Sequence, residues 1–153
     1  MADKIKADEL IRRYDADRHI ENGMFIERHY PAEGNGRPAS GSIYYYVKPG
    51  ERTQFHRIDC DEYWSHNAGS TLELWVIGLD GSLRIMHCGI TEGAEPTIRL
   101  AAGEIFASRL DENAPDSAFV TCITVPRFSY EGFQMLSREE MIRLYPDTAG
   151  FWE

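Results

Sequence analysis

The segment from Gly50 to Gly69 brings an imidazole and a carboxylate close together along the chain. Five residues separate Gly50 from His56, and Glu62 stands six positions after His56. An imidazole and a carboxylate in one pocket can support general acid–base chemistry. His56, Glu62 and Tyr46 are therefore our candidate catalytic residues: in a metal-independent isomerisation or epimerisation His56 would abstract a proton, Glu62 would orient and polarise the imidazole, and Tyr46 or a water would return the proton.

Strand alternation indicates which neighbours would share this pocket. Successive side chains of a strand point to opposite faces, so Gln54 and Ile58 would share the face of His56. Beyond a turn at residues 59–61 the same count places Trp64 and His66 on the face of Glu62, and an adjacent antiparallel strand would bring Glu62 opposite His56. Gln54, Trp64 and His66 are candidate ligand-binding residues.

The residues of this segment offer few metal ligands. A mononuclear site usually needs three or more nitrogen, oxygen or sulfur ligands from the protein. Ile58 stands two residues after His56, and only His66 or Glu73 would extend the set. We expect no cofactor, with a divalent metal at His56 and Glu62 as the lesser alternative. A purely structural, mutually hydrogen-bonded His56–Glu62 pair is the other interpretation.

Aromatic residues are frequent in the neighbouring β-rich runs. Alternation places Tyr44 and Tyr46 on one face and Tyr45 on the other, so at most one of these faces lines the pocket. Phe106, and Glu73 on a neighbouring strand, complete the candidate ligand-binding set.

The elements that must position these residues are short strands. From residue 43 to residue 125 the chain reads SIYYYV, TQFHRI, EYWSH, TLELWVIGL, SLRIMHC, TIRLA, EIFASRL and AFVTCITV, separated by turn residues. Many short strands without a helical pattern between them predict an antiparallel sandwich or barrel. Asp80-Gly81 between two apolar runs predicts a two-residue hairpin turn of type I′.

Two short helices are expected at the ends. Apolar positions between Ile5 and Tyr14 predict an amphipathic N-terminal helix. Ser137 and Glu140 form a capping box, and Pro146 prevents continuation, so a second helix is expected at about residues 137–146. We expect one domain over residues 1–153, with the β core at about residues 20–136.

Composition excludes several classes of function. With 16 basic and 25 acidic residues the formal charge is −9, which disfavours nucleic acid and anionic membranes as partners. Three widely spaced cysteines, no long apolar run and no signal-peptide pattern suggest a cytoplasmic protein. The sequence has no phosphate-cradling loop, serine-hydrolase elbow or H-E-x-x-H motif.

The segment resembles the first motif of the cupin superfamily, in which a glycine is followed by H-x-H, a glutamate and a glycine. Ile58 replaces the second histidine. The second motif, P-x-G-x-x-H, falls on residues 101–106, where Gly103 is kept and Phe106 replaces the histidine.

Four blocks extend the resemblance to the cupin-5 family, the domain of unknown function 985. They are HIENGMFIERHY from His19, the segment from Ser42 to Leu74, AAGEIF, and TVPRFSYEGFQML from Thr124. The resemblance implies an all-β double-stranded β-helix, or jelly roll, that forms a homodimer. By position it implies pocket roles for His56, Glu62, Trp64, His66 and Glu73, with Glu21 and Glu27 as weaker candidates. Ile20, Asn22 and Phe106 depart from the family pattern.

Three functions follow from these observations. The first is binding of a small polar metabolite, such as a carbohydrate or a related acid, with metal-independent isomerase or epimerase activity. The second is a non-catalytic ligand-binding or sensor module, and the third is a metal-dependent dioxygenase. Fold alone does not choose among them.

Overall fold

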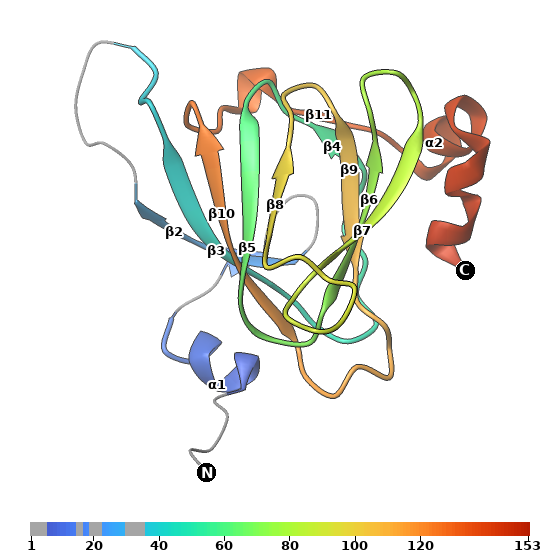
Figure 1. Cartoon of the computed structure of the whole chain (residues 1–153). Coiled ribbons are helices and arrows are strands. Elements are labelled where there is room, and N and C mark those ends of the chain that lie inside the picture. Colours follow the sequence, from blue (N-terminus) through green and yellow to red (C-terminus); the bar gives the residue numbers. More distant parts are fainter. Residues whose placement is uncertain (1–5, 15–16, 19–22, 30–35) are drawn as a thin grey trace.

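The computed structural model describes residues 6–14, 17–18, 23–29 and 36–153. These residues form two antiparallel sheets that face each other, with short helices outside them (Figure 1). This is the all-β jelly roll that the sequence predicts.

Two sets of strands make up the sandwich. The first sheet has the order β1 (Asp17–Arg18), β2 (Met24–His29), β3 (Gly41–Val47), β10 (Ala118–Val125), β5 (Asp61–Gly69) and β8 (Thr97–Leu100). The second sheet has the order β11 (Gln134–Met135), β4 (His56–Arg57), β9 (Ile105–Arg109), β6 (Leu72–Ile77) and β7 (Leu83–Cys88).

The main core fills the space between the sheets. Alternate residues of β6, namely Leu72, Leu74 and Val76, are fully buried and meet Val120 and Cys122 of β10 there. Because side chains alternate along a strand, one face of each strand contributes to this core, and the residues of the other face pack in separate clusters outside the sheets.

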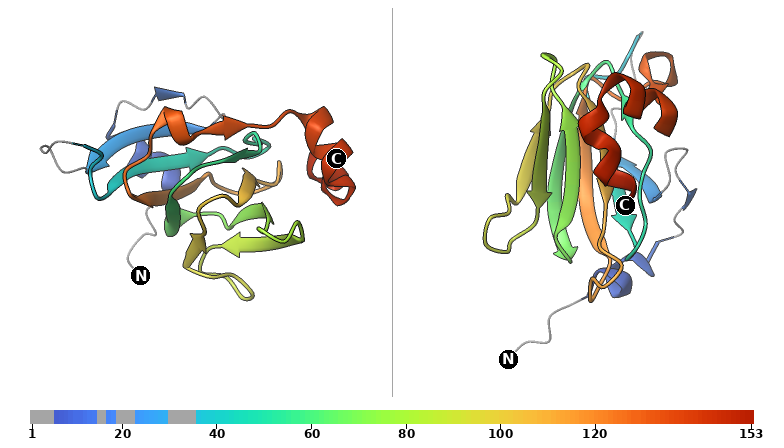
Figure 2. Two further views of the ribbon diagram at one scale, coloured as in Figure 1. Left: turned by 90° about the horizontal axis from the view of Figure 1, so that it is seen from above. Right: turned by 90° about the vertical axis from the view of Figure 1, so that its right-hand side faces the viewer.

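A second apolar cluster covers the outer face of the second sheet. Helix α2 (Arg138–Leu144) and the 3-10 helix η2 (Pro146–Trp152) pack there through Met141 and Phe151 against Phe55 and Trp75. Figure 2 shows both elements beside this sheet. The predicted capping box is confirmed, since Ser137 Oγ accepts from Glu140 N–H at 3.1 Å and Glu140 accepts from Ser137 N–H at 2.7 Å.

The N-terminal helix lies at one end of the sandwich. Helix α1 (Ala7–Ile11) packs Ala7 and Ile11 against Tyr46 and Phe119. The side chain of Asp116 accepts a hydrogen bond from the backbone N–H of Ala7 at 2.8 Å. This N–H belongs to the first turn of the helix, where backbone N–H groups have no partner within the helix. The helix predicted between Ile5 and Tyr14 is therefore present, but shorter; Ile5 lies outside the described residues.

The β6–β7 hairpin is present, but its turn differs from the prediction. Gly81 N–H donates to the Gly78 carbonyl, and Gly78 N–H donates to the Ser82 carbonyl, both at 2.9 Å. Three residues, Leu79 to Gly81, therefore form the loop rather than two. Gly81 supplies left-handed backbone at the end of this loop, with φ 82°, as in three-residue hairpins that end in a bulge.

The run from Thr53 to Ile58 forms less strand than predicted. Only His56 and Arg57 make up β4, which pairs with β9 and β11. Thr53 is held instead by a hydrogen bond from its N–H to the Ser108 carbonyl at 2.8 Å. This short strand carries the candidate histidine.

Candidate functional site

A cavity of about 1010 Å³ opens between the sheets. Its walls come from β3, β4, β5 and β10, and its rim comes from the segments around Arg37, Asp59 and Tyr130. These segments gather at the end of the sandwich opposite α1 (Figure 1). We refer to this space as the barrel cavity.

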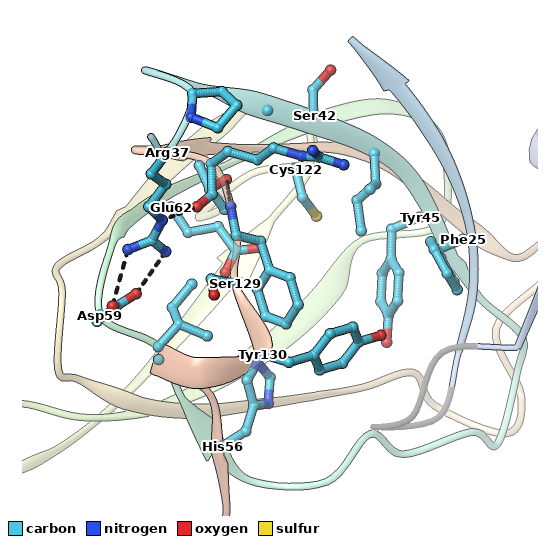
Figure 3. A pocket seen from close by; sticks show the side chains of 18 of the residues that line it. Phe25, Arg37, Ser42, Tyr45, His56, Asp59, Glu62, Cys122, Ser129 and Tyr130 are labelled. Atoms are coloured by element: carbon cyan, nitrogen blue, oxygen red, sulfur yellow. Dashed lines mark hydrogen bonds and ion pairs between the residues drawn. The ribbon is translucent and has the colours of Figure 1, made fainter. Parts of the chain in front are cut away.

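His56 and Glu62 both line the barrel cavity. His56 is 4% exposed and Glu62 is 7% exposed. The expected arrangement on adjacent strands is wrong, because β4 belongs to the second sheet and β5 to the first. The two side chains instead enter the cavity from opposing sheets (Figure 3). The turn between them crosses from one layer of the sandwich to the other.

The imidazole of His56 is held by the backbone just before β4 and by aromatic rings. Its Nδ1 lies 2.9 Å from the backbone carbonyl of Gln54. Because a carbonyl only accepts, Nδ1 carries the proton and Nε2 carries the lone pair in the neutral ring. Phe106 and Phe133 pack on the ring, with centroids 4.3 Å and 5.5 Å away. A backbone carbonyl thus orients the ring at its Nδ1 side.

Trp64 lies in the wall of the barrel cavity, whereas Phe106 is not among the residues that line it. Trp64 lines the barrel cavity, is 2% exposed, and contacts Tyr45 and Phe106 edge to face. Its Nε1 is buried without a hydrogen-bond partner among the described residues. Phe106 lies behind His56 and Trp64 as part of the main core.

Tyr46 does not reach the barrel cavity, so its expected placement beside His56 is corrected. It packs with α1 and lines a separate cavity of about 410 Å³ together with Arg12 and Lys48. Tyr45 faces inward instead and lines the barrel cavity. The predicted alternation along Tyr44, Tyr45 and Tyr46 is correct, but the inward face is that of Tyr45.

Glu73 also lies away from the barrel cavity, on the outer face of the second sheet. It accepts hydrogen bonds from Trp75 Nε1 and, at 2.7 Å, from Arg109 Nε. Arg109 in turn donates to the carbonyls of Gly150 and Phe151 at 2.9 Å and 3.0 Å. Glu73 therefore fastens the C-terminal segment, because odd positions of β6 point outward.

Gln54 and His66 are likewise not among the residues that line the barrel cavity. The side chain of Gln54 is exposed, and only its carbonyl takes part in the site. His66 follows Glu62 and Trp64 on β5, but further along the strand; its Nε2 is buried without a partner among the described residues. Of the weaker candidates, Glu21 and the side chain of Glu27 lie outside the described part of the chain.

The donor set of the barrel cavity does not match a metal centre. Ile58 lines the cavity beside His56 and supplies no ligand atom. Within the described residues, no three His, Cys, Asp or Glu side chains are grouped so that they could hold a metal ion. Burial, with a smaller contribution from Glu62, raises the pKa of the Cys60 thiol to about 11, and burial raises that of Cys88 to about 11. Both thiols are therefore protonated at neutral pH.

The sequence did not single out the polar rim. Arg37 donates from Nη1 and Nη2 to Asp59 at 3.0 Å and 2.8 Å, and from Nε to the Arg127 carbonyl at 2.5 Å (Figure 3). These residues come from three separate loops, in which no periodic pattern marks a functional side chain.

An aromatic cluster at the rim was also missed. Tyr130 of η1 (Tyr130–Gly132) and Phe128 line the barrel cavity, with ring centroids 5.0 Å apart, and Phe133 packs against both. These residues lie in the sequence block from Thr124 that resembles the family, so that resemblance was the sequence signal that could have identified them.

Solved structures share this fold. A protein from Shewanella oneidensis is similar with a TM-score of 0.85 and 27% identity, over 95% of this chain and 94% of that one. A hypothetical protein from Leishmania major gives 0.84 and 27%, over 94% of each chain. Oxalate decarboxylase from Bacillus subtilis gives 0.59 and 15%, over 88% of this chain and 34% of that one, which is a likeness of fold alone.

Two further comparisons concern sequence. No curated protein matches the chain. Among the described helices, none has both the length and the hydropathy that a membrane span requires. The profile of the Cupin superfamily (DUF985) matches residues 8–136, so the chain belongs to this family of cupin-fold proteins.

Proposed function

We propose that the protein binds a small polar, carbohydrate-like metabolite in the barrel cavity. The observation that carries this proposal is the convergence of His56 and Glu62 from opposing sheets on one cavity of about 1010 Å³. A few polar groups among aromatic walls are the usual composition of a small-molecule site.

The chemistry that this arrangement supports is metal-independent proton transfer of the isomerase or epimerase type. The lone pair on His56 Nε2 would take a proton from a carbon next to a carbonyl, and the electrons of that C–H bond would move onto the carbonyl oxygen. Return of the proton from the imidazolium or from water to the carbon completes the exchange. Tyr46 has no part in this step, because it faces the other cavity.

Ligand binding is tested first by thermal unfolding in a panel of sugars and small metabolites. A true ligand raises the unfolding temperature, because it binds the folded state preferentially. The proposal fails if no member of the panel does so. Mass spectrometry of a ligand extracted from the purified protein gives an independent answer.

Catalysis is tested by deuterium uptake into that ligand in heavy water. His56→Gln should retain binding and slow the exchange by at least about 100-fold, since it removes the base. Equal exchange rates for His56→Gln and the unaltered protein would contradict the role of His56. A ligand that stabilises the protein but exchanges no deuterium would favour the alternative, a non-catalytic binding module.

We also propose a cytoplasmic homodimer. Cys60, Cys88 and Cys122 are free and buried, which suits a reducing compartment. Strands β7 and β8 each have one neighbour in their sheets, and such edges are often covered by a second subunit. Light scattering that gives the mass of one chain would contradict the dimer.

A further inference from the structure

We propose that Phe133 is a positioning residue, which holds the imidazole of His56 in the orientation that its hydrogen bond to the backbone requires. The inference deepens the proposed function and rests on it in one respect, since a fixed imidazole matters for proton transfer. Phe133 is not among the described residues that line the barrel cavity, so it would act through His56 and not on the ligand itself.

The backbone that carries His56 is paired over only a short length. Strand β4 consists of His56 and Arg57 alone, whereas the neighbouring strand β9 has five residues. Gln54, whose carbonyl oxygen lies 2.9 Å from His56 Nδ1, precedes the strand. One hydrogen bond contributes modestly to stability and does not by itself prevent rotation of the side chain. The orientation of the imidazole therefore depends on the side chains that pack against it.

These side chains come from both sides of β4, which lies between β11 and β9 in its sheet. Phe106 of β9 stands directly opposite His56, with ring centroids 4.3 Å apart. On the other side Met135 of β11 stands opposite His56, so Phe133, two residues earlier, is a diagonal neighbour within reach of an aromatic side chain. The ring of Phe133 stacks on the imidazole at 5.5 Å between centroids, with an interplanar angle of 30°.

The chain on both sides of Phe133 is itself fixed. Phe133 N–H donates to the Tyr130 carbonyl at 3.2 Å, which closes η1. The side chain of the next residue, Gln134, accepts from Arg57 Nε at 2.7 Å and so joins β11 to β4. Because its own backbone is held in this way, the ring of Phe133 can restrict the imidazole that it contacts.

Phe133 can be replaced with less risk to the fold than Phe106. Phe106 is 1% exposed and belongs to the main core, so its truncation would destabilise the whole protein. Phe133 is partly exposed and is a member of none of the three core clusters. A substitution at Phe133 therefore tests the orientation of the imidazole with little disturbance of the core.

A fixed imidazole matters because proton transfer depends strongly on geometry. With the proton on Nδ1, the lone pair of the neutral ring of His56 lies on Nε2. A base that turns away from its substrate for part of the time transfers protons more slowly, although the substrate binds as before. Phe133 should therefore affect the rate of the chemical step and leave the affinity nearly unchanged.

The first measurement follows the imidazole by NMR without any ligand. The Nδ1–H resonance of His56 is assigned by its loss in His56→Gln, and its exchange with water is then measured. Exchange requires the ring to turn away from the Gln54 carbonyl, so the rate reports this opening. We expect Phe133→Leu to accelerate the exchange about threefold or more, as the loss of one aromatic pair predicts. Phe133→Tyr keeps the ring and should keep the rate.

Phe119→Leu is the matched control. Phe119 packs beside α1, in a cluster separate from the barrel cavity, so the same truncation there should leave the exchange of His56 Nδ1–H unchanged. Backbone amide exchange in β6, whose residues lie in the core, shows whether a variant has lost global stability. Circular dichroism verifies that each variant is folded.

The second measurement is deuterium uptake from heavy water into the sugars and small metabolites of the thermal-unfolding panel. Phe133→Leu should lower the maximal rate of uptake about threefold or more. The half-saturating concentration should change by less than about twofold, because Phe133 does not touch the bound molecule.

The inference is overturned if Phe133→Leu leaves the exchange of Nδ1–H unchanged, if Phe119→Leu accelerates it as much, or if Phe133→Tyr behaves like Phe133→Leu. Absence of a protected Nδ1–H in the unaltered protein would also overturn it. So would an unchanged maximal rate of deuterium uptake in Phe133→Leu, with or without a higher half-saturating concentration. If no member of the panel binds, the proposed function fails, whereas the NMR comparison still confirms or overturns the role of Phe133.

Discussion

Arg37 and Asp59 form a two-point ion pair across the rim of the barrel cavity, with Nη1–Oδ2 and Nη2–Oδ1 distances of 3.0 Å and 2.8 Å. The pair joins the segment before β3 to the turn between β4 and β5. Arg37 Nε also donates a hydrogen bond to the Arg127 carbonyl, so this one side chain connects three loops. A Cβ on Gly132 would lie 2.1 Å from the carboxyl carbon of Asp59, so the far end of the Arg127 loop also approaches this point closely.

Breaking this ion pair should loosen the rim more than it destabilises the protein. The side chains are 30% and 48% exposed, so Asp59→Asn should change the free energy of unfolding by less than about 1 kcal/mol. Amide hydrogen exchange of residues 127–133 should nevertheless accelerate. Arg99→Gln, which removes an equally short pair with Asp61, is the control and should leave the rim unchanged.

The same ion pair should respond to pH in one direction. The hydrogen bonds from Arg37 hold the pKa of Asp59 below its usual value. A carboxyl group with a lowered folded-state pKa contributes its interaction above the unfolded value and loses it as the pH falls through the folded value. The protection factors of the rim amides, which correct for the intrinsic pH dependence of exchange, should therefore fall only below the usual aspartate range, and a fall in these factors near neutral pH would contradict this assignment.

The two buried tryptophans should differ in what their indole N–H contributes. Trp75 Nε1 donates to Glu73, whereas Trp64 Nε1 has no partner among the described residues. Replacement by phenylalanine removes similar volume at both positions, so Trp75→Phe should cost about 1.5 kcal/mol more, the lower end of the value of a hydrogen bond to a charged group. Urea denaturation measures both; an equal or larger cost for Trp64→Phe would show that its N–H is satisfied.

Glu104 should stabilise the protein in a pH-dependent way. Burial alone would raise the pKa of Glu104, but hydrogen bonds from Arg84 and from Ala101 N–H outweigh burial and lower it. Glu104→Gln should therefore cost about 1–3 kcal/mol near neutral pH. The cost should shrink as the pH falls below the usual glutamate range. Glu92→Gln on an exposed loop is the control, and a cost independent of pH would contradict the role of the charge.

Two glycines with the same backbone conformation should tolerate alanine differently. Gly69 and Gly81 have φ of 87° and 82°, but a Cβ on Gly69 would lie 1.9 Å from the Ser117 carbonyl, whereas nothing lies within 4 Å at Gly81. Gly81→Ala should cost about 1–2 kcal/mol, from backbone strain alone. Gly69→Ala should cost clearly more in thermal unfolding, and equal costs would refute the clash.

Much of the fold could be predicted because its strands alternate regularly. The runs around Tyr45, Leu74 and Val120 each place alternate residues in the main core, and the capping box at Ser137 has a short local signature. The sequence did not tell which face of a strand is inward, and this accounts for the misplacement of Tyr46 and Glu73. Alternation fixes relative positions on a strand, but the partner sheet decides the direction.

The candidate site was only partly predictable for a related reason. His56, Glu62 and Trp64 lie on strands within a recognisable spacing, and all three line the barrel cavity. Arg37 and Tyr130 come from irregular segments that are distant from them in sequence. Their contribution depends on how the loops converge, which no local pattern records.

His56 and Glu62 project from different sheets. The distance between their side chains therefore depends on the thickness of the hydrophobic core between the sheets, and no hairpin pairing fixes it. Enlarging or trimming a core side chain that does not line the cavity, such as Leu72, would therefore widen or narrow the space available to a bound molecule. Core substitutions can thus change the ligand selectivity of this protein while every residue that contacts the ligand stays the same.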